Sequence, residues 1–416
     1  MNFGNLAARR FALVVAAVAI LASGCHGSQE WEPLTTQKIY VQDKFYDVAP
    51  LGPTRAIVVG YGGKILETSD SGLSWNAIDA GTDFALFSID FASDKVGWIV
   101  GQEGLILKTT DGGESWQRQR GEVYMGDDCR SPAHREGVFE ECRQEKEATS
   151  EILRSLQSKS SKEDLGIPPE RIEKECRQAV REKCSEAYLF AVSVIDENNV
   201  VAIGDRSVLT RTRDGGRTWT TETLTFIDPD MSPDWLLAFE DPVLYDVEFL
   251  DSRNGYVVGE FGKIYHTLDG GESWTQQHKS LMDETIFDVL DMPTLFDVEF
   301  LDEKNGMVVG LDGRVGITTD GGQDWNFVPT NVDDFTDPFY AGAIQENGVL
   351  WAVGASGQIV ISEPGAEFQR GSLGGSVNSW LRRIRFYDQD HGWVVGGFGL
   401  IMNTKDGGKT WYRRFG

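Results

Sequence analysis

Thr68-Ser69-Asp70-Ser71-Gly72-Leu73-Ser74-Trp75 decides the fold, because close copies of this stretch recur along the chain. Five further segments fit the same pattern of Thr-x-Asp-x-Gly-x-(Ser/Thr/Asp)-Trp, and they end at Trp116, Trp219, Trp274, Trp325 and Trp411. A seventh, weaker copy ends at Phe368 and keeps the acidic and glycine positions as Glu363 and Gly365. Successive aromatic ends are 41, 103, 55, 51, 43 and 43 residues apart. A repeat unit of about 43 residues, with one large insertion, explains this spacing.

Upstream of the box, each unit carries short runs that are typical of β-strands. Segments 86–91, 244–249 and 295–300 begin with an apolar pair, whereas 97–101 and 392–396 are apolar runs bounded by glycine. A Gly-x-x-Gly hairpin then leads to a third strand, and the box tryptophan opens a fourth. Four short antiparallel strands in each unit of about 40–50 residues indicate a propeller blade. The sequence therefore predicts an all-β protein, a seven-bladed β-propeller.

The box itself predicts a turn rather than a catalytic site. An aspartate followed by glycine accepts hydrogen bonds from nearby backbone N–H groups, and glycine tolerates positive φ. Six aspartates that repeat around a ring cannot all be catalytic. We therefore expect a structural role for the six Asp-box pairs, which are Asp70 with Trp75, Asp111 with Trp116, Asp214 with Trp219, Asp269 with Trp274, Asp320 with Trp325, and Asp406 with Trp411.

Composition and charge exclude several classes of protein. The hydrophobic content of 40 %, with only 13 prolines among 416 residues, excludes a disordered or collagen-like chain. Twelve tryptophans and 22 phenylalanines supply a large aromatic core. The formal net charge of −26 repels a polyanion, so nucleic acid is not an expected partner.

The first 24 residues are typical of an export signal. Arg9 and Arg10 precede an apolar run over 11–21, which is too short to span a bilayer but fits the core of a signal peptide. The small residues that follow end at Cys25 and resemble the bacterial lipobox, with Ala22 where leucine is usual. This resemblance implies that Cys25 is lipidated and anchors the mature chain at the periplasmic side of the outer or inner membrane. An ordinary cleavable signal is the alternative.

The remaining four cysteines, which are Cys129, Cys142, Cys176 and Cys184, cluster within 56 residues. In an oxidising compartment this cluster predicts two disulfides, and three pairings are possible. Zinc is the rival interpretation, which the lack of a Cys-x-x-Cys pair and the single nearby His134 disfavour. Segments 138–157 and 169–187 carry apolar residues at helical spacing, so disulfides should fasten a small pair of helices. Links from helix to helix favour Cys142 with Cys176 and Cys129 with Cys184.

The expected organisation follows from these segments. A signal peptide covers 1–24 and a linker covers 25–40. The seven-bladed propeller occupies 41–416, and the cysteine-rich helical insertion at 121–187 emerges between its second and third blades. The insertion either decorates the propeller or docks a partner.

The boxes, with the recurring Gly-Trp/Tyr-x-Val-Gly-x-x-Gly-x-Ile strands, resemble the photosystem II stability and assembly factor propellers of plants and cyanobacteria. In that family the propeller is not an enzyme, and an arginine-rich patch binds a newly made reaction-centre subunit. The resemblance implies a non-enzymatic, lipid-anchored, extracytoplasmic protein that binds a protein partner and assists the assembly or stability of a membrane complex. We expect no catalytic residue, no cofactor and no metal. The four-cysteine insertion departs from the photosynthetic members.

A secreted glycan-binding protein or a sialidase-like glycoside hydrolase is the alternative, because sialidases also contain Asp-boxes. Sialidases open with a Phe/Tyr-Arg-Ile-Pro segment and have six blades. This chain lacks that segment. Arg383-Ile384-Arg385-Phe386 resembles it only superficially and lies near the C-terminus instead of the N-terminus. Paired carboxylates for hydrolysis, such as Asp297 with Glu299, belong to the repeat rather than standing apart from it.

Two groups of residues are candidates for binding the partner. The third and fifth positions of the innermost strands should face a central channel and are acidic in several blades: Asp47, Asp90, Asp246, Glu248, Asp297 and Glu299. The last blade instead carries Arg382, Arg383 and Arg385, which either neutralise these carboxylates or form a basic site with Arg206 and Arg314. The second group is aromatic and stands at the hairpin tips opposite the boxes, namely Tyr61, Phe261 and Phe398, beside the loops 233–237 and 280–282.

Overall fold

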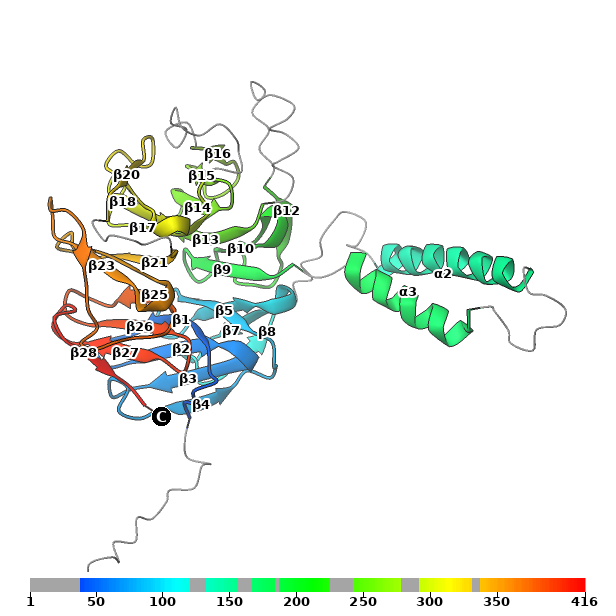
Figure 1. Ribbon diagram of the computed structural model, residues 1–416, viewed down its shortest axis with the longest axis horizontal. Coiled ribbons are helices and arrows are strands. Elements are labelled where there is room, and N and C mark those ends of the chain that lie inside the picture. Colours follow the sequence, from blue (N-terminus) through cyan, green and yellow to red (C-terminus); the bar gives the residue numbers. More distant parts are fainter. Residues whose placement is uncertain are drawn as a thin grey trace, which may run out of the picture. The chain divides into compact units, whose positions relative to one another are not determined.

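The structure is a computed structural model that describes residues 38–119, 132–155, 167–183, 187–224, 242–277, 292–330 and 337–415. These residues include seven four-stranded antiparallel sheets, each built from strands that are consecutive in the chain. The inner strand of every sheet contacts the inner strand of the next, and β25 (Leu381–Phe386) contacts β1 (Phe45–Pro50), so the ring closes. The predicted all-β, seven-bladed propeller is confirmed (Figure 1).

Strands in the first four blades run from the channel outward in chain order. Blade one contains β1, β2 (Ala56–Gly60), β3 (Lys64–Thr68) and β4 (Asn76–Asp79). Blade two contains β5 (Leu86–Phe91), β6 (Gly97–Gly101), β7 (Ile106–Thr109) and β8 (Gln117–Arg118). Blade three contains β9 (Leu189–Val194), β10 (Val200–Gly204), β11 (Val208–Thr212) and β12 (Thr220–Thr223). Blade four contains β13 (Leu244–Phe249), β14 (Gly255–Gly259), β15 (Ile264–Thr267) and β16 (Thr275–Gln276).

The last three blades follow the same plan. Blade five contains β17 (Leu295–Phe300), β18 (Gly306–Gly310), β19 (Val315–Thr318) and β20 (Asn326–Val328). Blade six contains β21 (Phe339–Ile344), β22 (Leu350–Gly354), β23 (Ile359–Ser362) and β24 (Gln369–Arg370). Blade seven contains β25, β26 (Gly392–Gly396), β27 (Ile401–Thr404) and β28 (Trp411–Arg413). Short 3-10 turns join the second and third strands at η2 (Tyr61–Gly63), η3 (Gln102–Gly104), η5 (Asp205–Ser207), η8 (Leu311–Gly313) and η9 (Ala355–Gly357).

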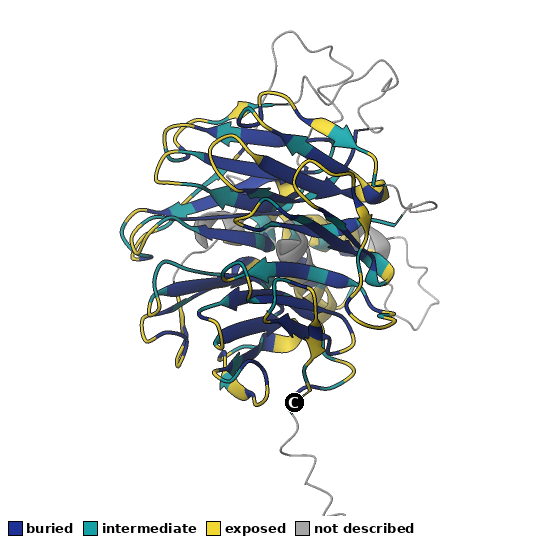
Figure 2. Ribbon diagram, turned by 90° about the vertical axis from the view of Figure 1, so that its left-hand side faces the viewer, coloured by how far each residue is buried: buried dark blue, intermediate teal, exposed yellow. Residues whose placement is uncertain are grey.

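The hydrophobic core lies between neighbouring blades. Phe45 and Val58 of blade one, for example, pack in one cluster with Trp393 and Val395 of blade seven. The second strands are buried along their whole length because a neighbouring blade covers each face, which explains their continuous apolar sequences. Buried residues accordingly fill the strands, while exposed residues lie mainly in the turns (Figure 2).

In four blades, two, four, five and seven, the second strand has glycine at both ends, and blade five shows that close approaches explain both glycines. A Cβ atom at Gly306 would lie 2.5 Å from a ring carbon of Phe300, so this glycine makes room for the phenylalanine that ends the inner strand. A Cβ atom at Gly310 would lie 2.2 Å from the carbonyl oxygen of Thr294. Larger residues at either position would push adjacent strands apart.

The Asp-box turn is held by its own side chains. Asp70 accepts hydrogen bonds from the hydroxyl of Thr68 at 2.8 Å and the N–H of Ser74 at 2.9 Å, and the Thr68 oxygen accepts the N–H of Gly72 at 2.8 Å. The hydroxyl of Ser74 donates to the same carboxylate and lowers the pKa of Asp70 to about 2. Every acceptor of this aspartate is engaged within the turn, as the structural interpretation of the box predicts.

Four box tryptophans pack edge to face on the phenylalanine that ends the inner strand of their blade, as in Phe300 with Trp325, whose ring centroids are 5.9 Å apart. Phe368 takes the place of the tryptophan in blade six and is buried. Trp274 is only half-buried, so we expect its loss to cost less stability than the loss of a fully buried box tryptophan. Trp411 is only 6 % exposed and contacts Trp351 of blade six as well as Phe386.

The insertion between blades two and three contains α2 (Pro132–Ser155) and α3 (Pro169–Lys183). A disulfide joins Cys142 to Cys176 with a Cα–Cα distance of 5.6 Å, which confirms this predicted pairing. Cys25, Cys129 and Cys184 lie outside the described residues, so the lipidation and the second disulfide stay predictions. Neither α2 nor α3 is apolar over a length that would cross a membrane, and no other described helix is.

Removing the indole of Trp411 should destabilise the propeller, because the side chain is buried at the contact of blades six and seven. We expect Trp411→Ala to lower the free energy of unfolding by about 3–5 kcal/mol, measured by urea denaturation. Tyr412→Ala is the matched control, since this adjacent side chain is 47 % exposed; it should change stability by less than about 0.5 kcal/mol. Equal effects of the two substitutions would contradict the packing argument.

Candidate functional site

The inner strand is an edge strand of every blade, so the N–H groups on its channel side need acceptors from outside the sheet. Side chains of the preceding blade provide them. Asp47 accepts the N–H of Ile89 in blade two at 3.0 Å, and Asp297 accepts that of Gly342 in blade six at 2.7 Å. Three more links join Asp90 to Val194, Ser193 to Phe249, and Asp246 to Val298. Four aspartates and Ser193 therefore link blades one to six, each to the next.

Arg383 lies inside the channel and forms ion pairs with three of these aspartates. Its guanidinium forms ion pairs with Asp47 of blade one at 3.3 Å, with Asp246 of blade four at 3.3 Å, and with Asp297 of blade five. The Arg383 side chain is 6 % exposed, and the three aspartates are buried. Burial opposes ionisation of Asp47, yet Arg385 and Arg383 hold its pKa below the ordinary value. This arginine thus connects four of the seven blades.

A second charged layer lies at the fifth position of the inner strands. Arg385, with 32 % of its side chain exposed, is 3.5 Å from Asp47. Burial raises the pKa of Glu299 to about 7, although Arg385 and Arg383 favour its ionised form. Burial and the neighbouring Glu299 together raise the pKa of Glu248 well above its usual range. Arg383 and Arg385 face six channel carboxylates, and this imbalance adds to the effect of burial on the pKa of both glutamates.

The opposite end of the channel is apolar. A β-bulge occurs at the second position of every inner strand and turns that side chain to the mouth of the channel. Six blades carry an aromatic residue there, and we call these the collar: Tyr46, Phe87, Phe190, Tyr245, Phe296 and Tyr340. Ring centroids of successive members are 4.9–5.9 Å apart, and all six rings are half-buried. The collar therefore presents a nearly continuous aromatic surface.

Arg382 occupies the collar position in blade seven. Its guanidinium donates to the carbonyl oxygen of Tyr340 at 3.2 Å, and the side chain is half-buried. Burial and Glu260 raise the pKa of Tyr245 to about 12, whereas the charge of Arg382 acts in the opposite direction. Arg382 also opposes the increase in the pKa of Tyr46 that burial causes. The arginine is thus near rings on two sides of the mouth.

The turns after the second strands lie at the same end as the collar, because the last residue of each second strand pairs with the first residue of the inner strand. We call this end the hairpin face, and the Asp-box turns lie at the other end. Tyr61 and Phe398 are 61 % and 57 % exposed there, as expected. Arg206 and Arg314 are also exposed on this face, at different blades.

Two predicted placements are wrong. Phe261 is half-buried because it packs against the cluster that contains Tyr256 and Leu295, so it is not an exposed tip. Arg383 is not at an accessible rim; its three ion pairs support the alternative in which an arginine neutralises the channel. A substitution of glutamate at Arg383 would place a fourth carboxylate among three, so we expect that change to destabilise the fold. The loops 233–237 and 280–282 lie outside the described residues.

Sequence reasoning missed the collar, although its signal is present in the repeat. An aromatic residue follows the first apolar residue in six inner strands, and arginine replaces it once, at Arg382. Because the side chains of a regular strand alternate between its two faces, the residue at this second position would be expected to point between blades. The bulge at this position, which reverses that direction, has no local signature in the sequence.

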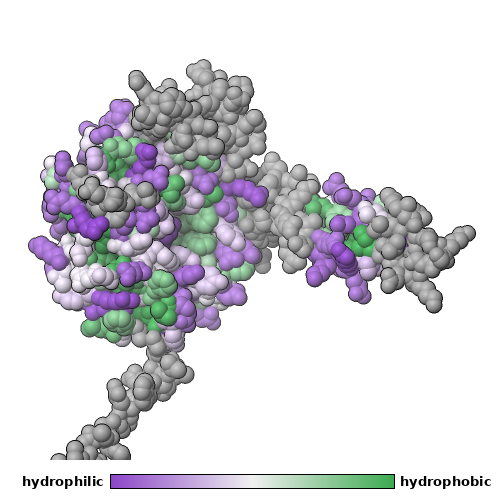
Figure 3. All heavy atoms as spheres, viewed as in Figure 1, coloured by the Kyte–Doolittle hydropathy of each residue, from purple (hydrophilic) through white to green (hydrophobic). Residues whose placement is uncertain are grey.

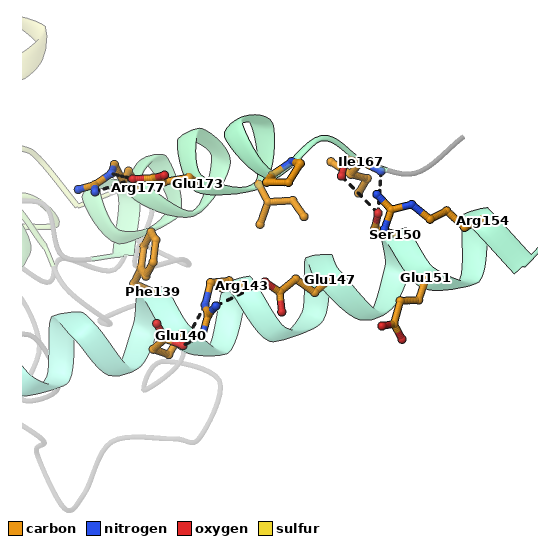
Figure 4. Close-up of a pocket in the computed structure, with 12 residues that line it drawn as sticks. Phe139, Glu140, Arg143, Glu147, Ser150, Glu151, Arg154, Ile167, Glu173 and Arg177 are labelled. Atoms are coloured by element: carbon orange, nitrogen blue, oxygen red, sulfur yellow. Dashed lines mark hydrogen bonds and ion pairs between the residues drawn. The ribbon is translucent and has the colours of Figure 1, made fainter. Parts of the chain in front are cut away.

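The two helices of the insertion enclose a groove of about 640 Å³ (Figure 4). Its charged residues pair with one another: Arg143 contacts Glu140 and Glu147, and Arg177 contacts Glu173 at 2.7 Å. Many hydrophilic residues cover this part of the molecule (Figure 3). The groove therefore offers few unpaired groups to a ligand.

No three His, Cys, Asp or Glu side chains within the described ranges are arranged to hold a metal ion. Seven blades, their Asp-boxes and the collar define the class of this protein, an Asp-box β-propeller with a channel closed by side chains.

Comparisons with known proteins agree with this class. A model of the family described as "Photosynthesis system II assembly factor YCF48" matches residues 25–126. The chain is 23 % identical over 270 residues to the photosystem II assembly lipoprotein Ycf48 of Synechococcus sp. (strain CC9902), covering 55 % of this chain and 75 % of that protein. These findings support a propeller of the photosystem II assembly factor-like family, as the sequence resemblance predicts.

Solved structures share the fold at low sequence identity. The structure described as "YCF48 bound to D1 peptide" is 17 % identical, with a TM-score of 0.56 over 88 % of this chain and 95 % of the other. The GH74 xyloglucanase from Xanthomonas campestris is 12 % identical, with a TM-score of 0.58 over 91 % of this chain and 55 % of the other. Both are likenesses of fold.

Replacing Arg383 should destabilise the propeller strongly, because three buried aspartates would lose their shared cation. We expect Arg383→Gln to lower the free energy of unfolding by about 3–5 kcal/mol, whereas the exposed Arg314→Gln should have an effect within about 0.5 kcal/mol. Adding Asp246→Asn and Asp297→Asn to Arg383→Gln should restore part of the loss. A loss below about 1 kcal/mol for Arg383→Gln would contradict the bridging role.

The channel should also make stability depend on pH. Glu299 has a pKa of about 7 in the folded state, against an ordinary value of 4.5, so the folded state binds more protons between these pH values. The free energy of unfolding should therefore fall as pH rises from about 4.5 to 7, by up to about 3 kcal/mol for this group. Glu299→Gln should flatten this dependence in urea denaturation at pH 5, 6, 7 and 8, whereas exposed Glu103→Gln should not. An unchanged slope for Glu299→Gln would exclude the raised pKa.

Proposed function

We propose that this protein is a lipid-anchored, extracytoplasmic propeller that binds a protein partner and assists the assembly or stability of a membrane complex. The proposal includes lipidation of Cys25 and no enzymatic activity. The observation that carries it is the mouth of the channel, where aromatic rings and Arg382 are half-buried, whereas Arg383 and three aspartates below them pair with one another. Similarity to photosystem II assembly lipoproteins supports the same function, and a subunit of a photosynthetic reaction centre is the partner that this similarity suggests.

A glycoside hydrolase needs carboxylates that are free to act on a substrate. Asp297 accepts the N–H of Gly342 and pairs with Arg383, so this carboxylate already has a structural task. The GH74 enzyme shares only the fold with this chain. Binding therefore remains the better supported function.

The hairpin face should contact the partner. We would place a photoreactive phenylalanine analogue at Phe398, express the lipidated chain in its host, irradiate the cells and identify cross-linked proteins by mass spectrometry. The same analogue at Tyr412, an exposed residue on the outermost strand of blade seven, is the matched control. We expect a membrane-complex subunit from Phe398 and not from Tyr412.

Cys25→Ser should release the protein from membranes and reduce this cross-link, because the anchor brings the propeller to its partner. Equal cross-linking from both positions would contradict a specific face. Turnover of a xyloglucan oligosaccharide or a chromogenic sialoside by the purified protein would favour the hydrolase alternative.

A further inference from the structure

We infer that the collar and Arg382 together form a docking site for an internal segment of a partner polypeptide, in which an apolar side chain stands next to an aspartate or glutamate. This inference rests on the proposed function, since it describes the part of the partner that binds. It concerns the channel mouth rather than a general basic patch, because Arg383 and Arg385 lie deeper and pair with channel carboxylates.

Arg382 supplies the charged part of this site. Among the described residues, its guanidinium has a single hydrogen bond, which goes to the neutral carbonyl of Tyr340. Two carboxylates on the hairpin face, Asp205 and Glu260, accept the backbone N–H groups of Tyr188 and Val243 at 3.2 and 2.9 Å. Among the described residues, neither carboxylate forms an ion pair with Arg382. A half-buried guanidinium with spare donors favours a carboxylate, which can accept two parallel hydrogen bonds.

The collar supplies the apolar part. Its six rings are half-buried, so their remaining surface is available at the mouth, and aromatic rings are common anchors in protein interfaces. Trp380 stacks on Tyr46 with a centroid distance of 6.0 Å and an interplanar angle of 13°, which extends the apolar surface away from the axis at blades seven and one. An aromatic or aliphatic side chain in this ring would contact several ring faces and edges.

The surroundings of the mouth favour a segment that continues past Arg382. The apolar surface extends on one side, where Tyr61 and Phe398 are exposed at blades one and seven. Exposed arginines stand at other blades, with Arg206 in blade three and Arg314 in blade five. A segment that crosses the mouth would therefore place apolar residues first and acidic residues after them.

The floor of the mouth keeps the segment at the surface. Arg383 and its three aspartates are buried directly below and fill the channel with paired charges. A further ligand carboxylate that went deeper would meet the channel carboxylates, which already outnumber Arg383 and Arg385. The partner segment therefore lies across the mouth instead of threading the channel.

The test uses the mature propeller and a fluorescein-labelled peptide, Gly-Ser-Leu-Phe-Asp-Gly-Glu-Glu, with both ends capped. Fluorescence anisotropy at low salt should show saturable binding that Arg382→Gln weakens about tenfold or more. Tyr245→Leu removes one ring from the collar and should weaken binding several-fold. Arg118→Gln on the exposed outer strand β8 and Tyr412→Ala are the matched controls and should leave the affinity unchanged.

Changes in the peptide test its chemistry. Replacing its aspartate by asparagine, or its Leu-Phe pair by serines, should weaken binding about tenfold. Equal binding of the asparagine peptide, or binding only by a peptide with a free C-terminal carboxylate, would overturn the inference. Circular dichroism and melting temperature must be native for each variant; if Arg382→Gln fails to fold, Tyr245→Leu with the peptide series decides.

The inference and the proposed function can fail separately. A partner that cross-links from Phe398 while the peptide does not bind would remove the collar site and leave the proposed function standing. Peptide binding that Arg382→Gln does not affect would also remove the site. Failure of the cross-link from both Phe398 and Tyr412, in cells where the protein is membrane-bound, would remove the proposed function itself.

Discussion

The open edge of the inner strand is the constraint on which the rest of this structure depends. Seven such edges meet around one axis, and their N–H groups would be left without acceptors in a channel lined by apolar side chains. Carboxylates solve this problem because they only accept hydrogen bonds, as Asp47 does for Ile89. Their charge then creates a second problem, since several lie close together. Arg383 reduces their mutual repulsion, because its guanidinium pairs with Asp47, Asp246 and Asp297.

This division of tasks separates structural charge from charge that remains for binding. Asp47, Asp90, Asp246 and Asp297 accept backbone N–H groups, and three of them pair with Arg383. Among the described residues, the one hydrogen bond of the Arg382 guanidinium goes to the neutral carbonyl of Tyr340. The same repeat position that carries aromatic rings in six blades carries this arginine in the seventh. Because blade seven carries an arginine where the other six carry an aromatic ring, the mouth of the channel is not symmetric. A bound segment would therefore have a defined orientation around the axis.

Much of the fold could be predicted from the sequence because each repeat carries local signals: the Asp-box turn, paired glycines and strands of fixed length. The Cys142–Cys176 link followed from the expectation that helix should be joined to helix. The site was less predictable. Arg383 and Arg385 are two residues apart, yet burial differs sharply between them, and only the ring brings Asp246 to Arg383 from 137 residues away. Phe261 and Phe398 occupy equivalent tips, and neighbouring side chains cover only the former.

The seam between blades seven and one has a consequence for the topology of the chain. All four strands of each blade are consecutive, so no strand is exchanged across this seam, which is held by contacts such as Trp75 with Trp393, centroids 5.9 Å apart, and the pairing of Asp47 with Arg383. The chain crosses the six other blade boundaries but does not pass from blade seven to blade one at this seam. The order of blades along the gene is in that sense arbitrary: a circularly permuted chain, joined at this seam and opened at another, would encode the same ring.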